Sequence, residues 1–207
     1  MSTDERRRRL REALVDAAER VIAESGLGSL KARDLAREVG CALGAIYTVF
    51  PDLDTLILSV NSRTLALLDK HLMESGGIGP KAGSVEEPGA ATQRLVALAN
   101  GYLGFAAQNR HRWQALFAHR MADGRPVPDW HRAEQMRLFS YVEEPLRALQ
   151  TNLPDEDRSL LARSLFSAVH GIVSLGLEEK LTSVPLPKLQ RQLELLVSAT
   201  AHGLKDG

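Results

Sequence analysis

The sequence predicts an all-α protein with a small N-terminal domain followed by a larger C-terminal helical domain. Apolar residues recur at spacings of three and four along almost the whole chain, which is the periodicity of amphipathic helices. No stretch of useful length alternates apolar and polar residues as a half-buried strand does. Breaks that contain glycine or proline separate the periodic stretches, so we expect several helices of ordinary length.

The composition is that of a soluble globular chain. Of the 207 residues, 44% are hydrophobic and 25% are charged, and 26 basic residues balance 26 acidic ones. No apolar run approaches the roughly 20 residues of a membrane span, and the charged N-terminus does not resemble a signal peptide. Cys41 is the only cysteine, which excludes an internal disulfide. We therefore expect a cytoplasmic protein.

The first predicted helix begins with a capping box, in which Ser2 and Glu5 can satisfy each other's backbone donors. Gly26 and Gly28 are expected to end it, because glycine adopts the left-handed cap conformation easily. Residues 6–11 carry five arginines near the start of this helix. This run is either an arm that seeks phosphates or a solvated helix face, and charge alone does not separate the two.

Two short helices and one long helix are expected next. The short ones cover about residues 31–39 and 42–48, and Gly40 provides the turn between them. Asp52 is a good N-cap for the long helix, which continues to about Leu72.

The remaining residues predict a flexible loop and five more helices. Residues 74–90 are rich in glycine and proline, which is typical of a mobile connection. The domains are therefore predicted as residues 1–52 and 53–207. The later helices are expected at about 91–109, 111–121, 129–150, 155–181 and 186–204.

Residues 30–50 have the pattern of a helix-turn-helix. The small residues within 42–45 would let the second short helix approach DNA closely, as a helix in the major groove must. Tyr47 lies one turn further along, where its hydroxyl can reach a phosphate. A generic helical hairpin would explain Leu35 and Ile46 as core residues, but it would not explain the small face.

Residues 10–58 resemble the DNA-binding domain of the TetR family of bacterial transcriptional regulators. The resemblance lies in two motifs, Arg33-Asp34-Leu35-Ala36-Arg37-Glu38-Val39-Gly40 and Gly44-Ala45-Ile46-Tyr47-Thr48-Val49-Phe50. It implies a homodimer that binds double-stranded DNA, usually as a repressor of a palindromic operator, and that a small-molecule effector releases. Three positions depart from the family pattern: Ala42 replaces a serine, Val49 a histidine and Leu53 a lysine.

The predicted DNA-binding residues have two roles. Lys31, Tyr47 and the N-terminal arginines are expected on phosphates, which position the protein on the duplex. The small residues of the second short helix are expected at base edges, so readout should depend on thymine methyl groups and DNA shape. The full set is Arg6, Arg7, Lys31, Ala42, Leu43, Gly44, Ala45, Tyr47 and Thr48.

Aromatic residues gather in the second domain, between residues 102 and 166. Such rings, with a few polar groups, can line a pocket for a small apolar or amphipathic effector. They can equally be ordinary core residues, because aromatic rings dominate core packing. The effector-binding residues that we predict are Tyr102, Phe105, Trp113, Phe117, Phe166 and His170.

The last two helices are predicted to form the dimer interface as half of a four-helix bundle. The first of them contains Gly171 and Gly176, which are best tolerated where another helix approaches closely. The alternative is that both helices simply complete the core of one chain. The predicted interface residues are Leu161, Leu165, Ala168, Ile172, Leu189, Leu193, Leu196, Val197 and Thr200.

Enzymatic function is not expected. The sequence has no glycine-rich phosphate loop or nucleophile elbow, and its six histidines lack metal-ligand spacing, so we expect no cofactor and no metal. Cys41 is expected to pack in the turn, with a redox role as the alternative. Control by a protein partner, or no control at all, would leave nearly the same sequence. Neither the effector, the operator nor the regulated genes follow from it.

Overall fold

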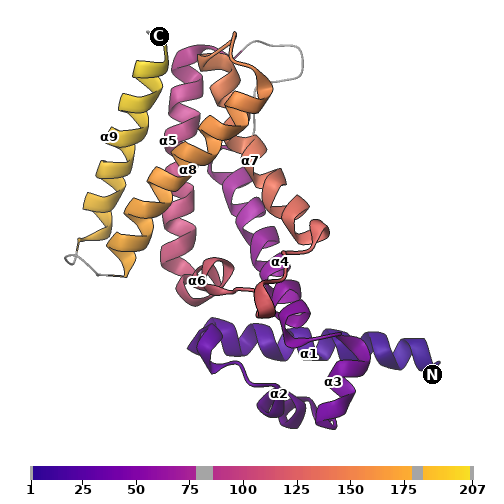
Figure 1. The fold of residues 1–207 in the computed structure, drawn as a ribbon. Coiled ribbons are helices and arrows are strands. Elements are labelled where there is room, and N and C mark those ends of the chain that lie inside the picture. Colours follow the sequence, from indigo (N-terminus) through magenta and orange to yellow (C-terminus); the bar gives the residue numbers. More distant parts are fainter. Residues whose placement is uncertain (1, 78–85, 179–183, 206–207) are drawn as a thin grey trace. The chain divides into compact units, whose positions relative to one another are not determined.

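The computed structural model describes residues 2–77, 86–178 and 184–205, which form nine α-helices with no strand among them (Figure 1). The all-α prediction is confirmed over these residues. Packing divides the chain into an N-terminal unit, residues 1–67 with 109–134, and a C-terminal unit, residues 68–108 with 135–207. The predicted boundary between residues 52 and 53 separates a DNA-binding domain from an effector-binding domain. The packing units do not test that division, so it stays a prediction.

Helix α1 (Thr3–Ser25) packs against α2, α3 and α6 of the N-terminal unit. The Ser2 hydroxyl accepts a hydrogen bond from the Glu5 N–H at 3.1 Å, which is one half of the predicted capping box. The helix ends at Gly26, whose φ of 78° suits glycine. A short 3-10 turn, Leu27–Ser29, follows. The inner face of α1 buries Leu14, Val15, Ala17, Ala18 and Ile22.

Helices α2 (Ala32–Val39) and α3 (Leu43–Val49) form the predicted pair of short helices. Gly40 joins them in the left-handed conformation, with φ 74° and ψ 34°, which a residue with a side chain adopts only at a cost. The N–H of Cys41 donates to the Ala36 carbonyl at 2.9 Å and completes the tight turn. The side chain of Cys41 is partly buried against the core, as predicted.

Helix α6 (Arg110–Ala118) also belongs to the N-terminal unit, although the sequence placed it in the second domain. Its Ala115 lies in one hydrophobic cluster with residues of α1, α2 and α3. The ring of His111 bonds the Ala23 carbonyl of α1 at 3.1 Å. These contacts tie a segment from the middle of the chain to the helix-turn-helix.

Helix α4 (Leu53–Leu72) begins in the N-terminal unit and continues in the C-terminal unit. A π-helical turn, Met73–Gly77, follows it directly. Of the predicted flexible loop at 74–90, residues 78–85 lie outside the described residues. The ends of that prediction were wrong, because residues 74–77 complete the π turn and α5 already begins at Pro88.

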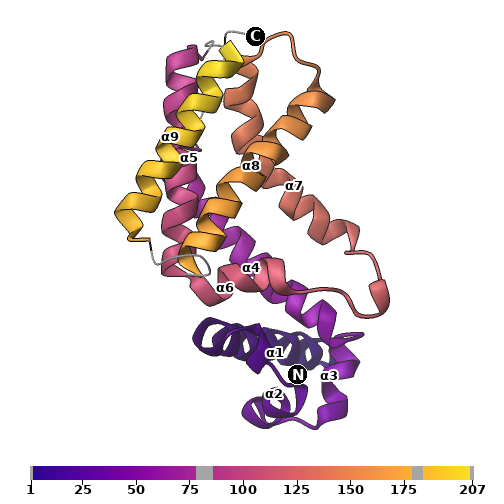
Figure 2. The ribbon, with the colours of Figure 1, turned by 60° about the vertical axis from the view of Figure 1, so that its left-hand side comes forward.

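The C-terminal unit consists of α5 (Pro88–Gln108), most of α7 (Asp129–Leu149), α8 (Asp155–Leu177) and α9 (Leu186–Lys205). Helix α9 lies along α5 in both views of the fold (Figures 1 and 2). Helices α8 and α9 approach closely at Gly176, where a Cβ atom would overlap the Leu189 side chain. The core of the unit includes Leu95, Leu98, Leu103, Leu146, Ala162, Val173, Leu193 and Val197.

Candidate nucleic-acid interface

The second short helix, α3, has one buried face and one open face. Ile46 is fully buried and Phe50, just after the helix, is also buried, so both anchor α3 to the core. On the other face Leu43, Gly44 and Tyr47 are exposed, and 51% of Tyr47 is accessible. The helix therefore presents a small, mostly apolar surface ending in a phenol hydroxyl.

The ends of this open face are less polar than those of a typical DNA-reading helix. Ala42, at the N-cap, makes no side-chain hydrogen bond, as its departure from serine implies. The Thr48 hydroxyl donates to the Ala45 carbonyl at 2.7 Å, so its only proton is used within the helix. In this arrangement Thr48 can accept a hydrogen bond from a base amino group, but it has no proton left to donate to a phosphate.

Two exposed cations that the sequence predicts on phosphates lie on separate elements. Lys31 is exposed at the N-cap of α2 and makes no capping bond there. Arg6 is exposed in the second turn of α1. Both are suited to contact phosphate, because their charged groups are exposed to solvent and need no rearrangement of the core to reach a phosphate.

The arginine run at residues 6–11 does not form a single phosphate-seeking arm. Arg8 and Arg9 pair with Glu5, at 2.5 and 3.1 Å. Arg7 instead donates to the Thr48 carbonyl at 2.6 Å, and Arg11 donates to the Val49 carbonyl at 3.1 Å. The prediction that Arg7 binds DNA stays untested, but its guanidinium already holds the end of α3.

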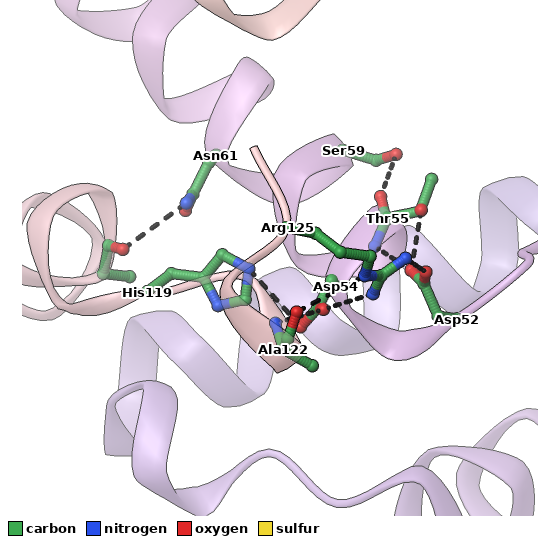
Figure 3. Close-up of polar contacts among 9 residues, drawn as sticks. Asp52, Asp54, Thr55, Ser59, Asn61, His119, Ala122 and Arg125 are labelled. Atoms are coloured by element: carbon green, nitrogen blue, oxygen red, sulfur yellow. Dashed lines mark hydrogen bonds and ion pairs between the residues drawn. The ribbon is translucent and has the colours of Figure 1, made fainter. Parts of the chain in front are cut away.

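The start of α4, directly after the helix-turn-helix, is a hub of hydrogen bonds (Figure 3). Asp52 caps the helix by accepting from the N–H and the hydroxyl of Thr55, each at 2.7 Å. Arg125, from the connection between α6 and α7, donates to Asp52 at 2.8 Å and to Asp54 at 2.9 Å. The N–H of Ala122, in the short 3-10 turn Ala122–Gly124, donates to Asp54 at 2.9 Å.

Two titratable groups of this hub have shifted pKa values. The hydrogen bonds from the Thr55 backbone and hydroxyl, aided by Arg125, lower the pKa of Asp52 to about 2. Burial lowers the pKa of His119, whose Nε2 lies 3.6 Å from a carboxylate oxygen of Asp54. Among the described residues this Nε2 has no hydrogen-bond partner. The sequence predicted the Asp52 cap, whereas Arg125 and His119 carried no signal for this contact.

Three of the predicted effector-binding residues meet in the C-terminal unit. The Tyr102 hydroxyl lies 2.8 Å from Nδ1 of His170, and the His170 ring stacks on Phe166 with centroids 5.7 Å apart. Phe166 also meets Tyr102 edge-on at 5.4 Å. Phe139, absent from the predicted set, packs edge-on against Phe166 at 5.4 Å. Its position three residues after Met136 in an aromatic-rich stretch was the signal that could have found it.

The other predicted effector-binding residues have different aromatic neighbours. The ring of Phe105 is 5.8 Å from the ring of His71 in the C-terminal unit. Trp113 and Phe117 contact each other at 5.7 Å within the N-terminal unit. No group of three or more histidine, cysteine or acidic side chains in the described ranges is arranged to hold a metal.

The predicted dimer-interface residues fall on two faces of α8 and α9. Four of them are buried within the chain itself, namely Leu165, Leu189, Leu193 and Val197. Ala168 is exposed, and Leu161, Ile172, Leu196 and Thr200 are half-buried. The outward face instead carries large apolar residues outside the predicted set, namely Leu160, Leu175 and Leu195.

Helix α8 is long and apolar enough to cross a membrane by length and composition, and only 22% of that stretch is buried in the chain. The sequence-based expectation that no stretch suits a span did not single it out, because Arg163, His170 and several serines interrupt the apolar run. A core helix of a soluble protein passes the same test.

A three-helix unit with a tight glycine turn, and with a second short helix open on one side, defines a helix-turn-helix DNA-binding regulator. Residues 14–60 match the model of bacterial regulatory proteins of the tetR family. Residues 95–200 match the model of the tetracyclin repressor-like C-terminal domain. The chain belongs to the TetR family, as the sequence motifs indicated.

Solved structures share this fold over nearly the full chain. A protein from Rhodococcus sp. RHA1 is 23% identical, with 92% of this chain and 94% of that chain covered and a TM-score of 0.68. BioQ, solved with its double-stranded DNA operator, is 16% identical over 95% and 98% of the two chains, with a TM-score of 0.61. RolR, solved with resorcinol, is 16% identical over 98% and 95%, with a TM-score of 0.63. None of the curated proteins compared with the chain matches it.

Proposed function

We propose that the chain is a cytoplasmic, homodimeric repressor that binds a near-palindromic operator and is released from it by a small apolar or amphipathic effector. The burial of only one face of α3 carries this proposal. Its inner face is anchored in the core by Ile46, while Leu43, Gly44 and Tyr47 remain open. A helix held in this way can enter a major groove without exposing core residues.

The contacts with DNA divide by chemistry. Tyr47, Lys31 and Arg6 supply the phosphate contacts that fix register, and the small face of α3 meets the base edges. Because that face offers little hydrogen bonding, we expect preference for thymine methyl groups and for sequence-dependent groove shape. The BioQ complex with its operator supports DNA binding by this fold.

Dimerisation provides the second recognition helix. The outward stripe of α8 includes Leu160, Ala168 and Leu175 at helical spacing, and Leu195 of α9 is 65% exposed. A Cβ at Gly171 would meet nothing within 4 Å among the described residues, so a partner helix can approach there. A second copy of the chain would bury this face and place two α3 helices on successive major grooves.

The effector site that we propose centres on Tyr102, Phe166 and His170. Two aromatic rings and a hydroxyl–imidazole pair suit a compact ligand with one flat apolar part and one polar group. The RolR complex with resorcinol shows that another protein of this fold binds a small aromatic ligand that carries hydroxyl groups. The effector acts by binding more tightly to the state with the lower affinity for operator.

Selection from random duplex DNA tests the proposal. The wild-type chain is compared with a Leu43→Ala, Tyr47→Ala double variant, and a Val127→Ala variant controls for loss of an exposed apolar residue outside the proposed DNA-binding and dimer surfaces. Enrichment of a palindrome by the wild type and the control, and not by the double variant, is the expected result. Release of the enriched duplex by aromatic alcohols would then separate ligand control from control by a protein partner or no control. If the wild type enriches no sequence even at low salt, the proposal that the chain is a DNA-binding regulator is refuted.

A further inference from the structure

The C-terminal end of α3 is stabilised by residues of another helix. The last carbonyls of an α-helix lack partners within the helix and carry the negative end of its dipole. Helix α3 has no basic residue in its own last turn. Arg7 and Arg11 of α1 supply the missing charge, because they bond the carbonyls of Thr48 and Val49.

Arg11 contacts three parts of the fold at once. Besides the Val49 carbonyl, it donates to the Ser59 hydroxyl of α4 at 3.2 Å. Its guanidinium carbon also lies 4.2 Å from the centre of the Phe50 ring, which is buried in the core. One planar side chain therefore connects α1, the end of α3 and the second turn of α4, a role that suits the five donors of arginine.

Arg7 and Arg11 lie one helical turn apart, so both project from the same face of α1. Arg8 and Arg9 pair with Glu5 instead. Four of the five arginines thus form two pairs with different contacts, although they are close in sequence, and Arg6 is exposed.

We propose that Arg11, with Arg7 in support, is a positioning residue that fixes the orientation of α3 and does not serve as a phosphate ligand. This inference rests on the proposed function of sequence-specific DNA binding. Base contacts along α3 need the helix at one depth and angle, whereas phosphate contacts tolerate small shifts. Loss of Arg11 should therefore weaken operator binding much more than binding to unrelated duplex.

The salt dependence of binding distinguishes the two roles. Each phosphate contact contributes about 0.9 to the slope of log affinity against log salt, through counterion release. A positioning residue contributes nothing to this slope. Arg11→Lys adds a second distinction, because lysine keeps the charge for a phosphate but cannot bond a carbonyl and a hydroxyl while stacking on a ring.

The experiment measures affinity for the selected operator and for a scrambled duplex of the same length, over about 50–200 mM salt. The wild type is compared with Arg11→Ala, Arg11→Lys and Arg7→Ala, and Arg6→Ala is the matched control from the same run of arginines. We expect Arg11→Ala to lower operator affinity on the order of tenfold, with the scrambled duplex and the salt slope nearly unchanged. Arg11→Lys should show the same pattern, and Arg6→Ala should lower both affinities and the slope.

Hydrogen exchange of free proteins provides a readout of folding. Faster exchange of the α3 amides, with α1 and α2 unchanged, is expected for Arg11→Ala. Global loss of protection, equal losses on both duplexes or rescue by lysine would each overturn the positioning role. If the wild type binds both duplexes equally, the proposed function itself fails. If the wild type prefers the operator and Arg11→Ala shows the same preference, the inference about Arg11 fails and the proposed function stands.

Discussion

Ile46 and Tyr47 are consecutive residues of α3 with opposite environments: none of Ile46 is accessible to solvent, whereas 51% of Tyr47 is. Ile46 is therefore expected to contribute to stability, and its neighbour Tyr47 to DNA recognition. The difference can be measured directly, because the two side chains can be altered one at a time without changing the backbone.

Truncation of Ile46 should reduce stability. Ile46→Ala removes buried methyl groups from the cluster that joins α1, α2 and α3, and we expect a loss of about 2–5 kcal/mol in the free energy of unfolding. Tyr47→Phe should leave that free energy nearly unchanged and should weaken binding to duplex DNA, because only the exposed hydroxyl is lost. Urea denaturation and DNA titration of both variants check the prediction; equal stability losses would contradict it.

The Asp52 cap should be important for the start of α4. Asp52→Ala removes the acceptor for the Thr55 N–H and hydroxyl, and we expect a loss of about 1 kcal/mol in the free energy of unfolding. Asp52→Ser keeps a capping oxygen and should recover most of this loss. Asp52→Asn keeps the cap but weakens the pairing with Arg125, so it separates the two contributions. An unfolding midpoint unchanged in the alanine variant would contradict this assignment.

Stability should fall as the solution becomes mildly acidic. Burial lowers the pKa of His119 below its ordinary value of 6.5. As the pH falls, this histidine is therefore protonated in the unfolded chain at a higher pH than in the folded chain. The contribution of His119 to the free energy of unfolding should therefore be at its maximum above pH 6.5, and it should decrease as the pH falls toward the pKa of the folded state. His131 and His170, whose pKa values burial also lowers, should add to this decrease.

Substitution separates His119 from the other histidines. His119→Gln should flatten the dependence of unfolding free energy on pH, by up to about 1.4 kcal/mol per pH unit in that interval. His202→Gln, at an exposed position of α9, is the control. Thermal denaturation between pH 7.5 and 5 provides the measurement, and an unaltered slope for His119→Gln would refute the role of this group.

Helix positions followed from local sequence, because apolar spacing, the Ser2 cap and the Gly40 turn are local signals. Contacts between distant residues did not. Arg11 and Val49 are 38 positions apart, and nothing in the sequence near either of them indicates the hydrogen bond that joins them. The packing of α6 on α1 was missed for the same reason, since a small buried residue such as Ala115 gives no sign of its partner.

The dimer prediction shows a different limit. Helix α8 is apolar on both sides, so its sequence does not distinguish the face that packs inside the chain from the face that remains open. Leu165 lies inward and Leu160 lies outward, although both fit a helical stripe. Only the packed fold separates them.

Leu193 and Leu195 of α9 give the sharpest test of the outward face. Leu193 is fully buried, whereas 65% of Leu195 is accessible. Leu195→Glu should place a charge in the proposed interface and yield a folded monomer, because an unpaired charge is costly to bury. Leu193→Ala should instead lower the free energy of unfolding by about 2–5 kcal/mol, by creating a cavity in the C-terminal unit.

Sedimentation equilibrium together with circular dichroism distinguishes these outcomes. The wild type is expected to be a dimer, and Leu195→Glu a monomer with unchanged helical signal and weakened operator binding, because one recognition helix reaches only a half-site. Lys188→Glu, exposed on the same helix, is the control for added negative charge. A Leu195→Glu protein that stays dimeric would place the interface elsewhere, and the apolar stripe of α8 would then need another occupant.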